Sequence, residues 1–177
     1  PVLDAGIRAG DTVVDLGCGA GIELCIAAEQ AGPRGHVIGI DMLDEMLDLA
    51  RRAAGEMQQL LGFENIELRN GLLENLPLPD DSADLVISNC VINLTEDKRK
   101  TFEEIRRVLR PGGRLVVADV CCGEEPPLAV RYNEKLRGEC IGGALLQDEL
   151  LGLLEDVGFE GISVLKRFPY REVSGHP

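Results

Sequence analysis

Two kinds of apolar pattern alternate along the chain. Short runs that are almost continuously apolar are typical of buried strands, and longer stretches with apolar residues at every third or fourth position are typical of amphipathic helices. The short runs predict strands at residues 11–17, 36–41, 65–71, 84–90, 114–120 and 161–168. The longer stretches predict helices at residues 18–32, 42–62, 97–113 and 145–159.

This alternation of strands and helices predicts the fold class. Strands that are apolar along most of their length belong to parallel sheets covered by helices on both faces. We therefore expect an α/β fold with a Rossmann-like, doubly wound, mostly parallel sheet. With 177 residues, 45% of them hydrophobic, the chain is suited to one core, so we expect a single domain over residues 1–177. Ligands of such sheets bind beyond the carboxyl ends of the strands.

The charge of the chain limits its partners. Thirty-one acidic residues and eighteen basic ones give a net charge of −13, which repels nucleic-acid backbones and anionic membrane surfaces. We expect neither as a partner. The first residues, PVLDAGIRAG, lack the basic flank and apolar core of a signal peptide. We therefore expect a cytoplasmic protein with reduced cysteines.

The cysteines and histidines predict no zinc site. Six cysteines form no CxxC pair and no zinc-ligand spacing, and the chain has two histidines. Cys25 falls on an apolar helix face, where a free cysteine is most often a core residue.

The segment DLGCGAG at residues 15–21 predicts a nucleotide-type cofactor site. Gly17 and Gly19 allow a sharp turn and the close approach of a ligand. Asp41 ends the second predicted strand, 22 residues after Gly19, where a carboxylate accepts hydrogen bonds from ribose hydroxyls. Asp15 in the turn repels a pyrophosphate but attracts an ammonium and a sulfonium group. The GxGxG spacing with Asp15 therefore favours S-adenosylmethionine over a dinucleotide.

In order along the chain, VVDLGCGAG, GIDM, LPLPDDSADLVIS and RVLRPGGRLVVADV resemble the recurring segments of class I S-adenosylmethionine-dependent methyltransferases. The resemblance implies that Asp15, Gly17 and Gly19 surround the methionine end of the cofactor. It also implies that Asp41 and Met42 lie around the ribose and adenine.

Three further residues are candidates for the cofactor site. Many family members have an aspartate after the third strand, where this chain has Leu72 and Leu73, so we expect adenine to be held by backbone groups near Leu73 and by Glu74. Asn89, at the end of the fourth strand, either contacts the cofactor or pairs with backbone groups there. Cys18 is either a wall of the cofactor site or a core residue.

Two more segments resemble the arsenite methyltransferases. They are SNCVINL at residues 88–94, followed by DK, and GECIGGAL at residues 138–145. The same subgroup carries a glycine, two apolar residues and a glutamate after the third strand, which matches GLLE. The resemblance implies that Cys90 and Cys140 bind trivalent arsenic as thiolates and are the catalytic residues. Soft thiolates suit this thiophilic substrate and leave its lone pair free to attack the sulfonium methyl group.

The resemblance is incomplete at both ends of the chain. Arsenite methyltransferases have a further cysteine upstream of the glycine turn, whereas this chain begins ten residues before the first predicted strand. Cys121, Cys122 or an external thiol is the alternative third ligand, and a thiol reductant is an expected partner. The family fold usually ends with an antiparallel strand, and nothing follows FPYREVSGHP to form it, so we expect a sheet without it.

Two other functions stay open at this point. One is methyl transfer to a small organic acceptor such as a quinone, with Cys90 only a wall of the pocket. The other is a truncated domain that binds the cofactor or the metalloid without turnover.

Overall fold

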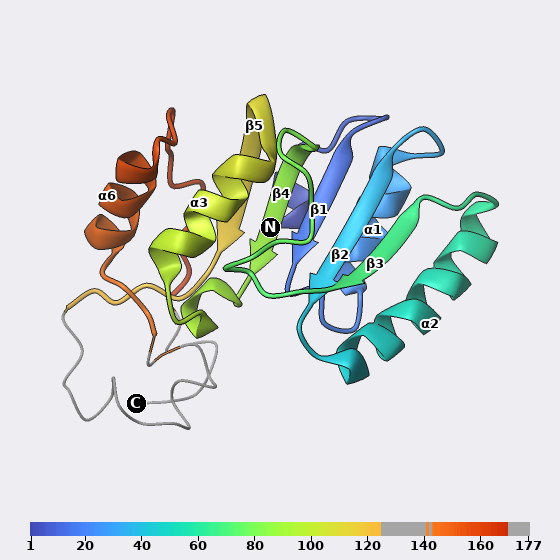
Figure 1. Cartoon of the computed structure of the whole chain (residues 1–177), viewed down its shortest axis with the longest axis horizontal. Coiled ribbons are helices and arrows are strands. Elements are labelled where there is room, and N and C mark those ends of the chain that lie inside the picture. The colour runs from blue at the N-terminus through green and yellow to red at the C-terminus, as the bar shows by residue number, and fades with distance from the viewer. Residues whose placement is uncertain (125–140, 142, 170–177) are drawn as a thin grey trace.

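The computed structural model describes residues 1–124, 141 and 143–169, and in this part five parallel strands form one sheet (Figure 1). The strands are β1 (Thr12–Leu16), β2 (His36–Asp41), β3 (Ile66–Asn70), β4 (Ala83–Asn89) and β5 (Leu109–Ala118). Their order across the sheet is β3-β2-β1-β4-β5. The strand order reverses between β1 and β4, which is where sheets of this kind form a ligand crevice.

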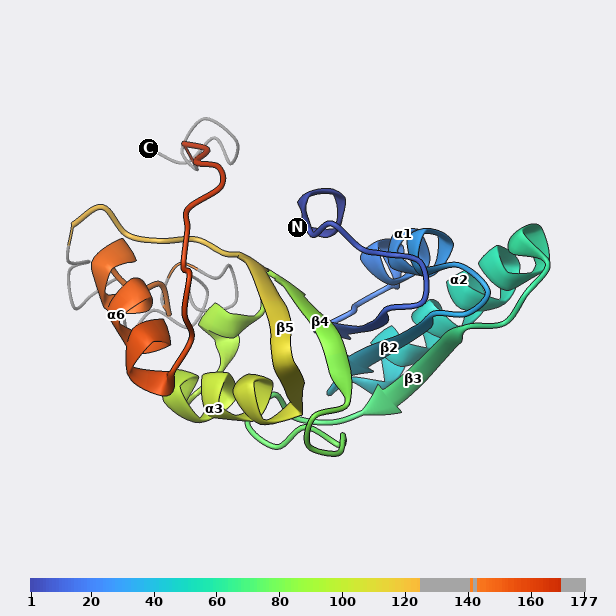
Figure 2. The ribbon, with the colours of Figure 1, turned by 90° about the horizontal axis from the view of Figure 1, so that it is seen from above.

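Helices cover both faces of the sheet. They are α1 (Ile22–Ala31), α2 (Asp44–Leu61), α3 (Lys98–Val108) and α6 (Gln147–Val157), with the short 3-10 helices η1 (Val2–Asp4) and η2 (Ile92–Leu94). Seen from above, α1 and α2 lie on one side of the sheet and α3 and α6 on the other (Figure 2). This arrangement confirms the predicted doubly wound α/β fold. Among the described residues, no helix has the length and apolar character needed to cross a membrane.

The core consists of apolar layers on the two faces of the sheet. Successive side chains of a strand point to opposite faces, so Val13 packs in the layer that contains α1, and Val14 packs in the layer that contains α3. Phe102 of α3 is fully buried, a burial that contributes about 2–3 kcal/mol. Its ring meets Phe159 edge to face, with centroids 6.5 Å apart. This contact joins α3 to the segment that follows α6.

Helix α3 begins with a side-chain cap and ends earlier than predicted. The carboxylate of Asp97 accepts a hydrogen bond from a backbone N–H of the first turn, at 2.9 Å, which satisfies one of the donors that a helix start leaves unpaired. The predicted helix over 97–113 is wrong in its last turn, since α3 ends at Val108 and β5 begins at Leu109. Pro111 explains the early end, because proline disfavours helical geometry at the residue before it.

The prediction of a strand at residues 161–168 is wrong. These residues follow α6 in an irregular conformation, and Val164 and Phe168 are exposed. Lys166 forms an ion pair with Asp4, with 2.6 Å between Nζ and Oδ1. An alternating apolar pattern gives a strand only where a neighbouring strand supplies hydrogen bonds. In the part of the chain that the structure describes, β5 pairs with β4 alone.

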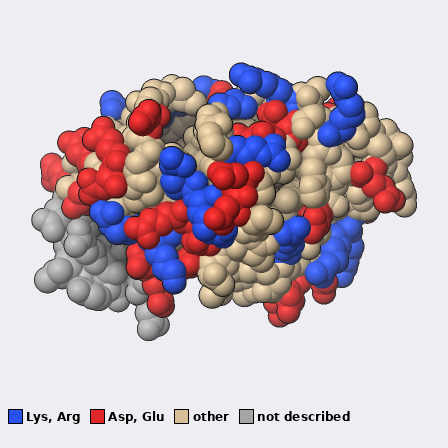
Figure 3. Space-filling view, turned by 45° about the horizontal axis from the view of Figure 1, so that its top comes forward, with Lys and Arg blue, Asp and Glu red and all other residues tan. Residues whose placement is uncertain are grey.

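Charged side chains pair locally over the surface. On the face shown in Figure 3, basic side chains lie among acidic ones. Arg110 contacts Asp84 at 2.7 Å, and Arg99 contacts Asp156 at 2.9 Å. Exposed pairs of this kind contribute little to stability, so the apolar layers remain the main source of the free energy of folding.

Candidate active site

The turn between β1 and α1 is built from glycines that no other residue replaces easily. Gly17 and Gly19 have φ angles of 63° and 52°, in the left-handed region where a side chain is strained. Gly17 also lies against the loop after β4, since a Cβ atom on it would lie 2.6 Å from Cγ2 of Val91. Val91 directly follows Cys90. The predicted cofactor turn is therefore packed against the segment that carries the predicted arsenic ligand.

Asp41 joins this turn to the start of α2. Its Oδ2 accepts a hydrogen bond from the N–H of Gly19, and its Oδ1 accepts one from the N–H of Leu43, each at 3.0 Å. A carboxylate has about four acceptor sites, so Asp41 retains acceptor capacity for ribose hydroxyls. Met42 follows it with a largely exposed side chain. Both residues lie at the carboxyl end of β2, where the sequence predicts the ribose and adenine.

A cavity of about 150 Å³ lies beside the turn. Its lining residues come from β1, from the turn and start of α1, and from the end of β4, and they are Asp15, Gly17, Cys18, Ala20, Ile22, Glu23 and Asn89. The structure therefore brings Asn89 together with Asp15, Gly17 and Cys18, whereas Gly19 does not line this cavity. Glu23 is a residue that the sequence analysis missed, because an acidic residue in the first turn of a helix is a common stabilising feature.

Two carboxyl groups of this cavity make it suitable for a cation. Asp15 is 2% exposed, and among the described residues its Oδ2 and Oε2 of Glu23 have no hydrogen-bond partner. The other oxygen of Glu23 lies 3.1 Å from the backbone nitrogen of Pro1. Burial, followed by the charge of Glu23, raises the pKa of Asp15 to about 8. Buried polar atoms normally have partners, so these oxygens fit the ammonium and sulfonium groups of S-adenosylmethionine.

The thiol of Cys18 belongs to the core. It is 7% exposed, in a cluster with Leu47 and Ala50. A Cβ atom on Gly39 would lie 2.9 Å from its Sγ. Burial and the charge of Asp15 raise the pKa of this thiol to about 12. Cys18 therefore stays neutral and acts as a wall of the cavity rather than as a reactive group.

After β3, the exposed apolar side chain is Leu72 and not Leu73. Leu73 is 7% exposed and packs in the main core, whereas Leu72 is 54% exposed. Oε1 of Glu74 accepts a hydrogen bond from the N–H of Glu96 at 3.0 Å, which ties this loop to the segment after β4. Leu72, which the sequence analysis did not assign to the site, thus presents an apolar side chain to solvent after β3. Its signal is an exposed apolar side chain at the carboxyl edge of the sheet, which only the structure reveals.

Cys90 has an unusual backbone conformation. Its φ angle is 56°, in the left-handed region that few residues other than glycine adopt. Its N–H donates a hydrogen bond to the carbonyl of Ala118 at 2.8 Å, so the turn is joined to the end of β5. Its side chain is exposed. Partial burial and the charge of Asp119 raise the pKa of the Cys90 thiol. The thiol therefore stays protonated at neutral pH until a ligand displaces the proton.

The other candidate thiols lie near the end of β5 or outside the described residues. Cys121 is exposed and Cys122 half-buried, and the N–H of Cys122 donates to the carbonyl of Leu145 at 2.9 Å. Cys140 lies outside the described residues. Within the described ranges, no three His, Cys, Asp or Glu side chains converge as a metal site. The complete ligand set for arsenic thus stays a prediction.

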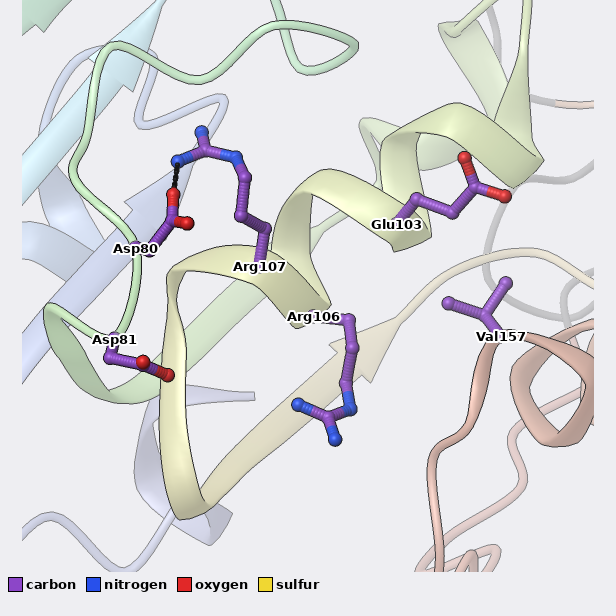
Figure 4. A pocket seen from close by; sticks show the side chains of 6 residues that line it. All are labelled: Asp80, Asp81, Glu103, Arg106, Arg107 and Val157. Carbon is purple, nitrogen blue, oxygen red and sulfur yellow. Dashed lines mark hydrogen bonds and ion pairs between the residues drawn. The ribbon is translucent and has the colours of Figure 1, made fainter.

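A shallow hollow of about 320 Å³ at the other edge of the sheet has a structural explanation. It is lined by Asp80 and Asp81, which precede β4, by residues of α3 and by Val157 (Figure 4). Arg107 is turned toward Asp80, 2.8 Å away, and also contacts Glu104 at 2.7 Å. The Asp80–Arg107 ion pair holds the loop before β4 against α3, and the Glu104–Arg107 pair lies within α3, so we assign this hollow no ligand.

Comparison with known proteins agrees with this geometry. Residues 7–158 match the family model described as "Methyltransferase domain". The chain is 40% identical to the arsenite methyltransferase of Halobacterium salinarum over 164 residues, which cover 93% of this chain and 41% of that protein. It is 38% identical to the human arsenite methyltransferase over 152 residues, which cover 83% of this chain and 40% of that protein. The chain thus spans about two fifths of the length of these relatives.

A solved structure is also similar to this chain. An arsenic(III) S-adenosylmethionine methyltransferase from Chlamydomonas reinhardtii superposes with a TM-score of 0.81 and 38% identity, over 97% of this chain and 61% of that one. These matches confirm the predicted fold class and S-adenosylmethionine as the cofactor. The chain belongs to the S-adenosylmethionine-dependent methyltransferases of class I and resembles arsenite methyltransferases over most of its length.

Proposed function

We propose that this chain transfers a methyl group to trivalent arsenic held by Cys90 and Cys140. The observation that supports this most directly is the packing of Gly17 against Val91. It brings the cofactor turn against the loop that carries Cys90. The resemblance of SNCVINL and GECIGGAL to arsenite methyltransferases supports the choice of arsenic, and so do the relatives of that name.

The cofactor is held by groups of opposite charge and by exposed apolar side chains. Asp15 and Glu23 face its cationic end, and Asp41 accepts hydrogen bonds from its ribose. Met42 and Leu72 flank the adenine, and the backbone near Leu73 and the carboxylate of Glu74 complete that end. Asn89 lies at the boundary between the cofactor cavity and Cys90.

Two thiols bind arsenite without a general base. Arsenite enters as neutral As(OH)₃, and each thiol of Cys90 and Cys140 replaces one hydroxide. The thiol proton and the hydroxide leave together as water, so a protonated Cys90 is the correct starting form. This agrees with the raised pKa of its thiol. The third arsenic position keeps a hydroxide or takes Cys121, Cys122 or an external thiol.

Methyl transfer needs positioning more than acid–base catalysis. When bound, S-adenosylmethionine supplies an electrophilic methyl carbon, to which the arsenic lone pair bonds as the carbon–sulfur bond breaks. Holding two reactants in line accounts for effective molarities on the order of 10⁵ M or more. Because the new bond uses the lone pair, arsenic loses two electrons formally. A thiol reductant therefore follows as a partner, in the reducing environment of a cytoplasm.

The test is methylation of arsenite with labelled S-adenosylmethionine and a thiol. We expect methylated arsenic from the wild type and at least about 10²-fold less from Cys90→Ser and Cys140→Ser, because one thiol alone positions the substrate poorly. Cofactor binding by these variants should stay within about twofold of the wild type. Cys25→Ala is the matched control, since Cys25 is buried in α1, outside the proposed ligand set.

Three outcomes contradict the proposal. The first is a wild type that methylates no arsenite, and the second is full activity in both serine variants. The third is methylation of a quinone acceptor with arsenite inert, which supports the organic acceptor instead. Cofactor binding without turnover on any acceptor supports a binding domain.

A further inference from the structure

Two buried carboxyl oxygens of the cofactor cavity lack a partner. Asp15 lies on β1 and is 2% exposed, and Glu23 lies in the first turn of α1. Oε1 of Glu23 accepts a hydrogen bond from the N–H of Val2 at 3.3 Å and lies 3.1 Å from the nitrogen of Pro1. Oε2 of Glu23 and Oδ2 of Asp15 have no hydrogen-bond partner among the described residues. Buried polar atoms normally have partners, so these two oxygens are available to a ligand in the cavity.

The lining of this cavity contains no basic side chain in the part of the chain that the structure describes. Burial, followed by the charge of Asp15, raises the pKa of the Cys18 thiol to about 12, so this thiol stays neutral. Asn89 is uncharged at any pH. The carboxyl groups of Asp15 and Glu23 therefore determine the charge of the cavity, and a positive charge inside it comes from the ligand.

The protonation of Asp15 depends on what surrounds it. Burial is the largest cause that raises its pKa to about 8, the charge of Glu23 is the second, and Asp41 adds a smaller contribution. The amino terminus and the N–H of Leu24 act in the opposite direction. Near neutral pH, the cavity without cofactor thus holds a protonated Asp15 close to the charge of Glu23. A cation in the cavity favours the carboxylate of Asp15, so its binding releases a proton.

Methyl transfer removes a positive charge from the ligand of this cavity. The methionine end of S-adenosylmethionine carries an ammonium, a carboxylate and a sulfonium group, with one net positive charge. In the transfer, the carbon–sulfur bond breaks and its electron pair stays on the sulfur, while a lone pair of the acceptor forms the new bond to carbon. The sulfur of the product, S-adenosylhomocysteine, is therefore neutral. The ammonium and the carboxylate are common to both molecules, so the charge of the sulfur distinguishes them.

We propose that Asp15 and Glu23 form a charge-sensing pair, which binds S-adenosylmethionine more tightly than S-adenosylhomocysteine and thereby favours release of the product. With the sulfonium present, both side chains are carboxylates and the positive ligand compensates one of the two charges. With the neutral sulfur, a second buried carboxylate is left without compensation, which is costly. Asp15 therefore takes up a proton from solvent, and the product loses its ion pair. This role concerns the cofactor alone and does not depend on the identity of the acceptor.

Three ligands and three variants separate charge from shape. Glu23→Gln removes one charge of the pair, and Asp15→Asn removes the group that exchanges a proton. Glu29→Gln is the matched control, because Glu29 is an exposed glutamate of the same helix that does not line the cavity. The ligands are S-adenosylmethionine, S-adenosylhomocysteine and sinefungin, in which a carbon that bears a protonated amine replaces the sulfonium. Calorimetric titration between pH 6 and pH 8, in buffers of different ionisation enthalpy, gives each Kd and the number of protons exchanged.

The wild type should treat the two charged ligands alike. S-adenosylmethionine and sinefungin should bind with release of a proton, and their affinity should increase by up to about tenfold per pH unit below about pH 8. The affinity for S-adenosylhomocysteine should change by less than about twofold over this range, because Asp15 keeps its proton. At pH 8 we expect S-adenosylmethionine to bind at least about tenfold more tightly than S-adenosylhomocysteine.

The variants should change this preference in different ways. Glu23→Gln should lower the affinity ratio of the two ligands at pH 8 by about tenfold. It should also move proton release to lower pH, because the charge of Glu23 no longer raises the pKa of Asp15. Asp15→Asn should bind all three ligands without exchange of a proton. Glu29→Gln should behave like the wild type.

Three results overturn the charge-sensing pair. The first is a wild type that binds S-adenosylmethionine and S-adenosylhomocysteine equally at pH 8, or that releases a proton with both. The second is a wild-type affinity ratio in Glu23→Gln. The third is sinefungin that behaves like S-adenosylhomocysteine, which means that shape and not charge is recognised. None of these titrations contains an acceptor, so the charge-sensing pair and arsenite methylation can each fail without the other.

Discussion

The Cβ atom that Gly17 lacks would lie 2.6 Å from Cγ2 of Val91. This contact is the structural link between the two halves of the proposed reaction, because Gly17 belongs to the cofactor turn and Val91 follows the proposed arsenic ligand. A side chain at position 17 would push the cofactor turn and the loop that carries Val91 apart. The adjacent Cys90 would move with Val91.

Gly17→Ala should therefore lower both cofactor affinity and stability. The left-handed φ angle alone costs about 1–2 kcal/mol for a residue with a side chain, and the overlap with Val91 adds to it. Gly62→Ala is the control, since Gly62 has a φ angle of 77° and open space around its missing Cβ. Calorimetric titration with S-adenosylmethionine and denaturant unfolding measure the two effects. Equal losses of cofactor affinity and stability in the two variants would show that the Val91 contact is unimportant.

Cofactor binding should depend on pH through Asp15. Its pKa rises from 3.8 to about 8 in the folded protein, and a cationic ligand prefers the carboxylate. Affinity should therefore increase with pH up to about 8, approaching tenfold per pH unit, with release of a proton on binding. Titrations in buffers of different ionisation enthalpy measure that proton. Asp15→Asn should bind weakly and without this dependence, and an unchanged pH profile in that variant would contradict the assignment.

The raised pKa of Asp15 also makes the stability of the cofactor-free protein depend on pH, and this stability falls as pH rises. Between about pH 4 and pH 8 the folded state keeps a proton on Asp15 that the unfolded state has lost, so the free energy of unfolding falls as pH rises. Asp15→Asn should remove this slope. Denaturant unfolding at pH 5 and pH 8 without cofactor compares the two proteins. A wild type whose Asp15 contribution grows with pH would contradict the buried, neutral carboxyl group.

Replacing Cys90 by glycine should stabilise the protein while ending arsenite methylation. Cys90 has a φ angle of 56°, and glycine relieves that strain by roughly 1 kcal/mol. Cys90→Ala, which keeps the strain, is the control. Unfolding by urea should give a higher midpoint for Cys90→Gly than for Cys90→Ala. The reverse order would mean that the conformation of Cys90 stores no strain.

Leu72 and Leu73 should respond differently to truncation. Leu73 is a core residue, so Leu73→Ala should cost about 2–5 kcal/mol in the free energy of unfolding. Leu72 is exposed beside the proposed adenine site, so Leu72→Ala should weaken S-adenosylmethionine binding with a change in stability within about 0.5 kcal/mol. Unfolding and calorimetric titration of both variants separate the two roles. Unchanged cofactor affinity in Leu72→Ala would remove this side chain from the site.

Most of the fold could be predicted because its strands are apolar on both faces. Runs such as Val37–Ile40 are buried along their whole length and need cover from two sides, which a parallel sheet between helices provides. The segment at 161–168 has a similar pattern, but strand formation depends on a partner whose position a local pattern does not contain. The end of α3 was predicted too late for another reason. Proline disfavours helical geometry at the residue before it, so Pro111 ends the helix before its own position.

For the candidate site, the sequence predicted which residues come close together at the glycine turn, but not the directions of their side chains. The spacing of Asp15 and Asp41 around the glycine turn was informative, because Asp41 accepts a hydrogen bond from Gly19 and Asp15 lines a cavity with Gly17. Nothing in the order of Leu72 and Leu73 says which of them is buried, and the raised pKa of Asp15 depends on Glu23 and on burial. These properties arise from packing between segments that are far apart in the sequence.

The hydrogen bonds from Gly19 and Leu43 to Asp41 have a kinetic consequence. They orient the carboxylate before any ribose arrives, so the conformational entropy of this side chain is already lost when the chain folds. The proposed ribose site is therefore ordered before the cofactor binds. We expect the cofactor to associate at a rate set by diffusion and desolvation, with no slow closing step at this end of the site.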